Sequence, residues 1–316
     1  MKRRSFTLGG LVATGLAVLG LGRRASAEGV PDYELRARAD AAAARKYFPY
    51  ELIEVNGDQA LIKWKELKGA GRGTPVVIGG EASGLRNLFE SFAPPSPNFP
   101  SPPSAQETLA KAAQIRWPDD FIAQRKADAA EADATFRKQL AENPNMPLPA
   151  VVMRDADGHS HTLSREETLA ELEMSHEPET GDWPAQPDGS PGLTVASDIL
   201  KGTPLPKVYI ALIPTDDWTA IPAYLHWGGW NECPVPEYHV AALRSWRDRY
   251  GVELVGLAFD TLNLTATRPP HTREDALALA KEQYVYCADI IDQGVETYSA
   301  LAATLMANDW WFFWWD

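Results

Sequence analysis

Apolar residues follow strand and helix periods along the first part of the chain. Residues 51–55 alternate polar and apolar side chains, which predicts a strand with one buried face. Apolar positions at helical spacing predict an amphipathic helix over 59–68. A strand at 74–78 and a helix at 85–92 follow, separated by glycines. Residues 28–93 are therefore predicted to form a small α/β unit.

The middle of the chain has a different composition. Prolines dominate residues 94–104, and Ala, Glu, Lys and Gln dominate 105–143, with a break at Trp117-Pro118. We therefore predict a Pro-rich linker and helical segment at 94–146. A hairpin, a helix capped by Ser164 and a Pro/Gly-rich loop are predicted in the next segment, 147–192.

The C-terminal part carries the strongest periodicity. Four apolar runs predict strands at residues 207–213, 223–227, 252–259 and 310–315. Three segments with helical spacing predict helices at residues 236–250, 273–287 and 295–307. This order predicts an α+β protein, with a mixed β-sheet and helices packed on it, in a C-terminal domain at 193–316.

The first 27 residues have the order of a secretory leader. Arg3 and Arg4 precede an apolar, glycine-diluted run, and Ala25-Ser26-Ala27 supplies a small-residue cleavage site. The paired arginines are typical of the twin-arginine route, which exports folded proteins. The run is too short for an uncleaved membrane anchor, the alternative. We expect cleavage after Ala27, a periplasmic or secreted protein, and no membrane attachment of the mature form.

Charge narrows the range of partners. Removing the five basic residues of the leader would change the formal net charge from −13 to −18. Such a surface repels phosphate backbones and anionic lipids, so neither nucleic acid nor a membrane surface is expected as a main partner. We therefore expect the partner to be an unidentified ligand or protein. The sequence does not identify a cofactor.

Tryptophan and cysteine suggest both structural and functional roles. Eleven tryptophans indicate a tryptophan-rich core, with an aromatic-lined cleft as the alternative. The two cysteines, Cys233 and Cys287, are compatible with one disulfide, with two buried thiols, or with a catalytic or metal-binding thiol. For the catalytic case, His226 or His239 could act as the base for Cys233.

Several motifs resemble those of one bacterial family. The most specific is Pro222-Ala-Tyr-Leu-His-Trp-Gly-Gly-Trp-Asn-Glu-Cys-Pro234. Four shorter motifs accompany it, at residues 249–255, 268–270, 282–287 and 314–316. Together they make residues 193–316 similar to the "domain of unknown function 4253" family, with a weaker resemblance at 47–90. The resemblance implies a fold but no activity, cofactor or catalytic residue.

Several polar residues are predicted to lie at the ends of the C-terminal strands and helices. In open α/β sheets, ligands bind at the carboxyl ends of the strands. The candidate catalytic carboxylates are Asp260, Glu232 and Asp289. The candidate binding residues are Trp230, Asn231, Cys233, Tyr286 and Asp292. We expect a binding or interaction module with an aromatic and acidic cleft. The alternative is a hydrolase in which Asp260 works with Glu232 or Asp289 as an acid and base pair. No metal site is expected.

Overall fold

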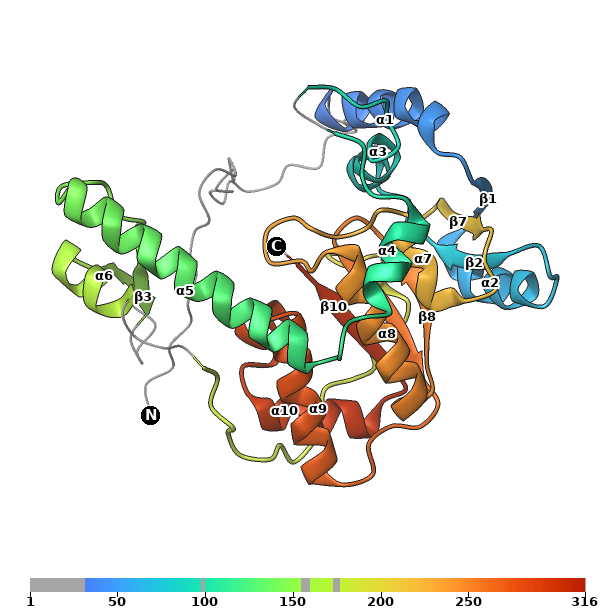
Figure 1. Ribbon diagram of the computed structural model, residues 1–316. Helices are drawn as coiled ribbons and strands as arrows, with labels where there is room; N and C mark the ends of the chain where they lie inside the picture. Colours follow the sequence, from blue (N-terminus) through green and yellow to red (C-terminus); the bar gives the residue numbers. More distant parts are fainter. Residues whose placement is uncertain (1–31, 98–99, 155–159, 173–176, 316) are drawn as a thin grey trace, which may run out of the picture.

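The computed structural model describes residues 32–97, 100–154, 160–172 and 177–315 (Figure 1). Arg3, Arg4 and the expected cleavage site after Ala27 lie outside these residues. Among the residues that are described, no helix combines the length and the apolar character needed to cross a bilayer.

A six-stranded mixed sheet organises the described part of the chain. Its strand order is β1-β7-β2-β8-β9-β10, and β2 pairs with β8 in parallel while the other neighbours are antiparallel. The strands are β1 (Glu51–Val55), β2 (Thr74–Val77), β7 (Val208–Ile213), β8 (Val252–Leu257), β9 (Thr261–Ala266) and β10 (Trp310–Trp314). Two short hairpins lie outside this sheet: β3 (Val152–Arg154) with β4 (Ser160–Thr162), and β5 (Ser197–Asp198) with β6 (Thr203–Pro204).

Helices surround the sheet and connect its strands. They are α1 (Asp32–Ala44), α2 (Ala60–Lys68), α3 (Ala82–Glu90), α4 (Ala105–Ala112), α5 (Asp119–Glu142), α6 (Arg165–Leu172), α7 (Ile221–Tyr224), α8 (Pro236–Tyr250), α9 (Arg273–Tyr286) and α10 (Tyr298–Ala307). A π-helical segment, Ile290–Val295, separates α9 from α10.

The two faces of the sheet contribute to two separate cores, because side chains alternate along each strand. In β10, Trp311 and Phe313 join the larger core, which contains residues of α8, α9 and α10. Trp310 faces the smaller core, where Trp64 of α2 and Val195 are buried. Five of the eleven tryptophans are buried: Trp64, Trp227, Trp246, Trp311 and Trp315. Four of these five buried tryptophans belong to the larger core, and Trp64 belongs to the smaller one. A tryptophan-rich core is what the composition indicated.

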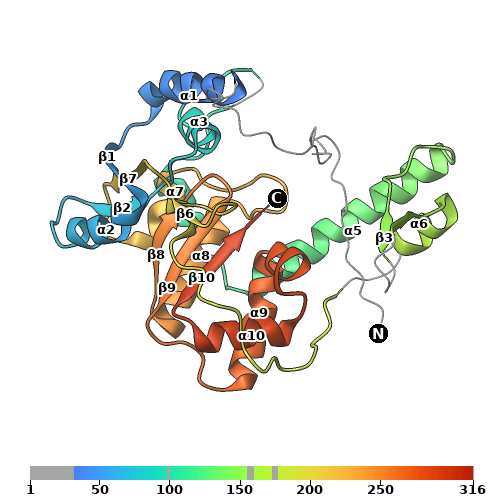
Figure 2. The same cartoon turned by 180° about the vertical axis from the view of Figure 1, so that it is seen from behind.

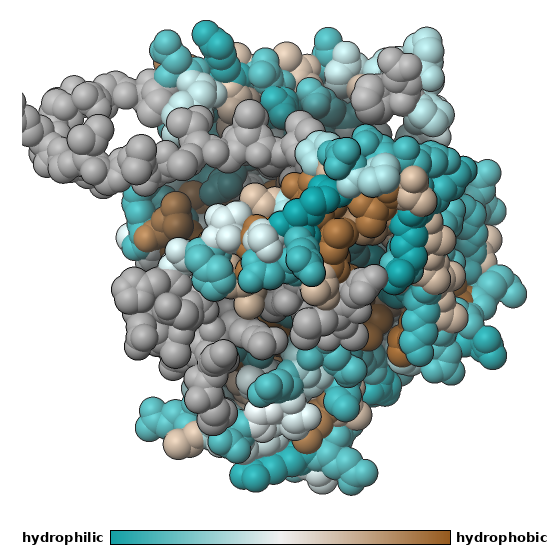
Figure 3. Space-filling model, turned by 90° about the vertical axis from the view of Figure 1, so that its left-hand side faces the viewer, coloured by the Kyte–Doolittle hydropathy of each residue, from teal (hydrophilic) through white to brown (hydrophobic). Residues whose placement is uncertain are grey.

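Helix α5 leaves the body of the molecule and carries a small unit at its far end (Figures 1 and 2). All side chains from residue 126 to 135 are exposed. Hairpin β3–β4 and α6 lie beside the far half of this helix (Figure 2). On the side toward which α5 projects, hydrophobic residues gather near the middle of the face and hydrophilic ones surround them (Figure 3).

The predicted α+β class with a mixed sheet is confirmed, and several elements differ from the prediction, among them α1 and the β5–β6 hairpin, which were not predicted. The strand predicted at 223–227 is wrong, because Ile221–Tyr224 form a helical turn with Pro222 at its start. A short apolar run cannot by itself distinguish a strand from a buried helical turn. Strand β9 was missed, because it begins only two residues after the predicted strand end at 259 and the two strands were not separated by a recognised turn.

The segment at 28–93 supplies strands to the same sheet as the C-terminal part. Strand β1 pairs with β7, and β2 lies between β7 and β8. The predicted boundaries after residues 93, 146 and 192 stay predictions, but the sheet itself is continuous across the first and last segments.

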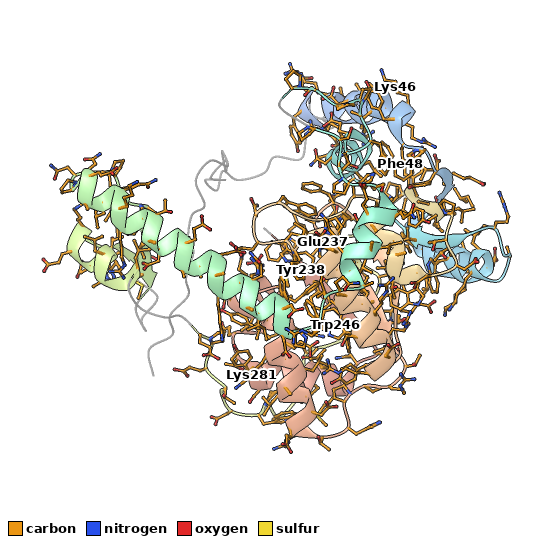
Figure 4. The ribbon with its side chains drawn as sticks, in the orientation of Figure 1. Lys46, Phe48, Glu237, Tyr238, Trp246 and Lys281 are labelled. Carbon is orange, nitrogen blue, oxygen red and sulfur yellow. The ribbon has the colours of Figure 1, made fainter. Side chains whose placement is uncertain are left out.

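A buried carboxylate ties three segments together. Glu282 on α9 accepts hydrogen bonds from the indole Nε1 of Trp117, at 2.6 Å, and of Trp246, at 2.7 Å. Its other oxygen accepts from the Arg249 guanidinium at 2.6 Å. Figure 4 marks Trp246 on α8, the helix that faces the start of α5. Since a buried charge must be paired and hydrogen-bonded, these contacts fix Trp117 against the C-terminal part.

Replacing Glu282 by Gln should destabilise the protein by about 3 kcal/mol. The amide nitrogen would face the donors of Arg249, and the guanidinium would lose its charged partner. Urea unfolding would measure the change. Glu274→Gln, at the exposed start of α9, is the matched control, with an expected change below about 0.5 kcal/mol. Equal midpoints for the two variants would contradict the role of Glu282.

Candidate functional site

The loop between α7 and α8 is folded back on itself through glycine geometry. Gly228 has φ of +112° and Gly229 has φ of +85°, values that favour glycine. The Gly229 N–H points to the carbonyls of Cys233, at 3.2 Å, and Pro234, at 2.9 Å. A Cβ at Gly228 would lie 2.7 Å from His239 Nε2. The backbone of this loop therefore packs directly on the imidazole of α8.

His239 is the centre of a buried cluster of aromatic and sulfur groups. Its Nδ1 lies 2.6 Å from the Tyr286 hydroxyl and its Nε2 lies 3.5 Å from Cys233 Sγ. The Trp227 and Trp315 rings pack against the imidazole, with centroids 4.5 and 5.7 Å from it. The structure thus brings together Cys233 and Tyr286, two predicted binding residues, inside the core rather than at a cleft.

The chemistry of this cluster is structural. Burial lowers the pKa of His239 to about 3 and raises that of the Cys233 thiol well above its ordinary value. The imidazole is therefore neutral at pH 7, and the thiol keeps its proton. Cys233 is thus not activated as a nucleophile here.

Cys287 is the second buried thiol. Its Sγ donates to the Trp314 carbonyl at 2.9 Å, and burial raises its pKa to about 12. Both cysteines are free in the structure. Of the states open from the sequence, this arrangement is that of two buried thiols.

The loop also carries two aromatic rings to the carboxyl end of β8. Trp227 Nε1 donates to the Ala258 carbonyl at 2.7 Å. The Trp230 ring stacks on Phe259, with centroids 4.9 Å apart and planes 13° from parallel. Trp230 is half-buried, and Phe259, on which it stacks, directly precedes Asp260 in the β8–β9 turn.

Glu232 at the far end of the loop is held by helix α5. It pairs with Arg125 at 2.5 Å, and the same guanidinium donates to the Glu232 carbonyl. The Arg125 guanidinium also lies over the Phe121 ring, and Phe121 packs on Tyr238 of α8, marked in Figure 4. Helix α5 therefore fixes the loop from outside.

Acidic side chains converge beside Trp230. Strands β2 and β8 are parallel neighbours, so their carboxyl ends lie at the same edge of the sheet, with Glu81 after one and Asp260 after the other. Partial burial raises the pKa of Glu81, and the charges of Asp260 and of Asp198 raise it further. Asp198 pairs with Lys201 at 2.6 Å. Across the described chain, neither Glu81 nor Asp260 forms an ion pair with a cation.

The other predicted residues lie elsewhere or turn outward. Asp289 accepts from Gln293 at 2.9 Å, and Asp292 lies 3.4 Å from the Tyr284 hydroxyl, both around the π-helical segment. Asn231 is exposed in the loop, with φ of +42°. Asp289 and Asp292 are therefore on a different element from Glu81 and Trp230, whereas Asn231 directly follows Trp230.

Two further features bear on binding. No group of three or more His, Cys, Asp or Glu among the described residues could hold a metal ion. A groove of about 400 Å³ lies between α2 and the strands β8 to β10, with Trp64 and Trp310 among its lining residues. None of the predicted site residues lines it.

Sequence reasoning missed three residues that shape the site: Glu81, Arg125 and Glu282. Glu81 lies in the glycine-containing turn between the predicted strand at 74–78 and the predicted helix at 85–92, to which no role was assigned. Its placement depends on the parallel pairing of β2 with β8, which no local pattern reveals. For Glu282, the neighbouring tryptophans were the available signal, because a buried indole N–H needs an acceptor.

The neutral state of His239 predicts a pH dependence of stability. Because its pKa is lower in the folded chain than the ordinary 6.5, its contribution is complete above pH 6.5 and is lost as the pH falls toward 3. His239→Gln keeps polar groups near Tyr286 and removes this titration. Between these two pH values the native protein should lose on the order of 4 kcal/mol more than the variant. Urea unfolding at several pH values would test this, and parallel stability curves would contradict it.

Comparisons with curated proteins and with solved structures found no match for the chain. A comparison with family models did find one, and its range contains β7 except for its first residue, the loop at 228–234, and β8 to β10. The resemblance predicted for the C-terminal part is thereby confirmed. Over residues 209–316 the chain matches the model of the family described as Domain of unknown function (DUF4253).

Proposed function

We propose that this protein is a binding module whose ligand surface lies at the carboxyl ends of β2 and β8. The observation that carries the proposal is the position of Glu81 and Asp260 after two parallel neighbouring strands. Burial, and then the charges of Asp260 and Asp198, raise the pKa of Glu81. Like charges held together without enough cations are unfavourable in the free protein. A ligand that supplies the missing positive charge would relieve that repulsion.

The chemistry of this surface favours a cationic ligand. The half-buried Trp230 ring stacks on Phe259, the residue before Asp260, and ammonium or guanidinium groups bind aromatic rings. The strongly acidic composition would also steer cations toward the protein. A ligand with Lys or Arg side chains, such as a basic peptide segment, combines both properties.

We further propose that this binding takes place outside the cytoplasm. The twin-arginine pattern of the first 27 residues supports export of the folded chain. The free cysteines agree with folding in a reducing compartment before export. The acidic charge again argues against nucleic acid as the partner.

The hydrolase alternative has less support. It needs Asp260 to work with Glu232 or Asp289. Glu232 forms an ion pair with Arg125, and Asp289 accepts a hydrogen bond from Gln293. Proton transfer through either carboxylate would first require these contacts to break. We therefore favour binding over hydrolysis as the function of the strand-end surface.

Neutralising two of the carboxylates should weaken cation binding. Glu81→Gln together with Asp260→Asn should raise the Kd for a synthetic Lys/Ser peptide about fivefold at low salt, since each exposed pair contributes up to about 1 kcal/mol. Added salt should reduce the difference. Calorimetric titration would measure the Kd.

Asp309→Asn is the matched control for this experiment. Asp309 is exposed and precedes β10, at the end of the sheet opposite to Asp260. It should leave the Kd unchanged. If the control lowers affinity as much as the double variant, binding depends on overall charge and the proposed surface is incorrect.

A further inference from the structure

The hairpin β5–β6 presents two large aliphatic side chains to solvent. Leu200 is 98% exposed and Ile199 is 64% exposed, at the tip between the two strands. The turn is closed by a backbone hydrogen bond from Gly202 N to Asp198 O, at 2.8 Å. The Lys201 N–H donates to the Asp198 carboxylate at 3.1 Å. These bonds order the turn while leaving its apolar side chains outside.

The base of this hairpin is anchored to the main sheet. Leu205 N–H donates to the Ala196 carbonyl, and Gly57 N–H donates to the Leu205 carbonyl, at 2.9 and 2.8 Å. The buried side chain of Asn263 on β9 accepts from Val195 N–H at 3.0 Å. The hairpin therefore holds its aliphatic tip in a defined position relative to the sheet.

The base of the hairpin lies against the turn that carries Glu81. A Cβ at Gly79, two residues before Glu81, would be 3.3 Å from the Val195 carbonyl oxygen. The charge of Asp198, directly before Ile199, adds to the burial and the Asp260 charge that raise the pKa of Glu81. An aliphatic pair near Glu81 and Asp260, which form no ion pair among the described residues, is suited to a surface with matching apolar and cationic groups. Anionic lipid headgroups would instead be repelled by the same carboxylates.

We propose that Ile199 and Leu200 form the apolar half of a docking surface whose partner is a basic amphipathic segment of another protein. The inference rests on the proposed function, because the cationic groups of the segment would bind at Glu81 and Asp260. The apolar side chains of the segment cover the hairpin tip. A segment with positive and apolar groups on adjoining faces has this chemistry when it is helical.

Two synthetic peptides of equal charge test the inference on the full chain. One has Lys and Leu at amphipathic helical spacing, and the other has Ser in place of every Leu. The native protein should bind the Lys/Leu peptide roughly tenfold more tightly, which corresponds to about 1.4 kcal/mol. Ile199→Ser with Leu200→Ser should remove this preference and leave the Kd of the Lys/Ser peptide unchanged. Fluorescence anisotropy of dye-labelled peptides would give both constants.

Ile62→Ser, at a 55% exposed aliphatic position on α2, is the matched control and should retain the preference. A preference that survives in the hairpin variant would overturn the inference, as would binding of anionic vesicles that the hairpin variant loses. Both outcomes leave the proposed function intact if the Kd of the Lys/Ser peptide still rises when Glu81 and Asp260 are neutralised. Failure of that dependence would instead reject the proposed function. Thermal unfolding of each variant would verify that the fold is unchanged.

Discussion

The buried carboxylate of Glu282 is the interaction on which the candidate surface depends. It holds the indole of Trp117, and helix α5 begins two residues later. From this fixed start, Phe121 packs on α8 and Arg125 reaches Glu232. The loop at 228–234 is thus held from the outside by a helix whose position the carboxylate determines. If the contacts of Glu282 were lost, the shift of Trp117 and α5 would move Arg125 and so the loop, because closely packed side chains transmit such displacements.

The same loop is held from the inside by His239. Gly228 has no side chain, so the backbone lies against the imidazole, and Trp227 packs on the ring. These inner contacts orient Trp230 outward onto Phe259. The sulfur and histidine groups that suggested catalysis in the sequence therefore serve to shape a neighbouring surface. Burial decides between the two roles, because it keeps both the thiol and the imidazole neutral.

Sequence patterns predicted local elements better than the contacts among them. Helix α8 could be predicted from apolar spacing and the glycine that ends it, and α9 from the cap at Thr272. Cys233 and Tyr286 were both predicted to belong to one binding region, but the sequence did not show that they are buried. Glu81 could not be placed, because its proximity to Asp260 follows from strand order. Strand order depends on long-range pairing, which leaves little trace in a local window.

The parallel pairing of β2 with β8 has a further consequence. The family match begins at residue 209, so it includes Trp230 and Asp260 but neither Glu81 nor Asp198. Residues 209–316 alone would retain the His239 cluster and the stacked indole, but not the crowding of carboxylates that raises the pKa of Glu81. The acidic surface is therefore assembled from the whole chain.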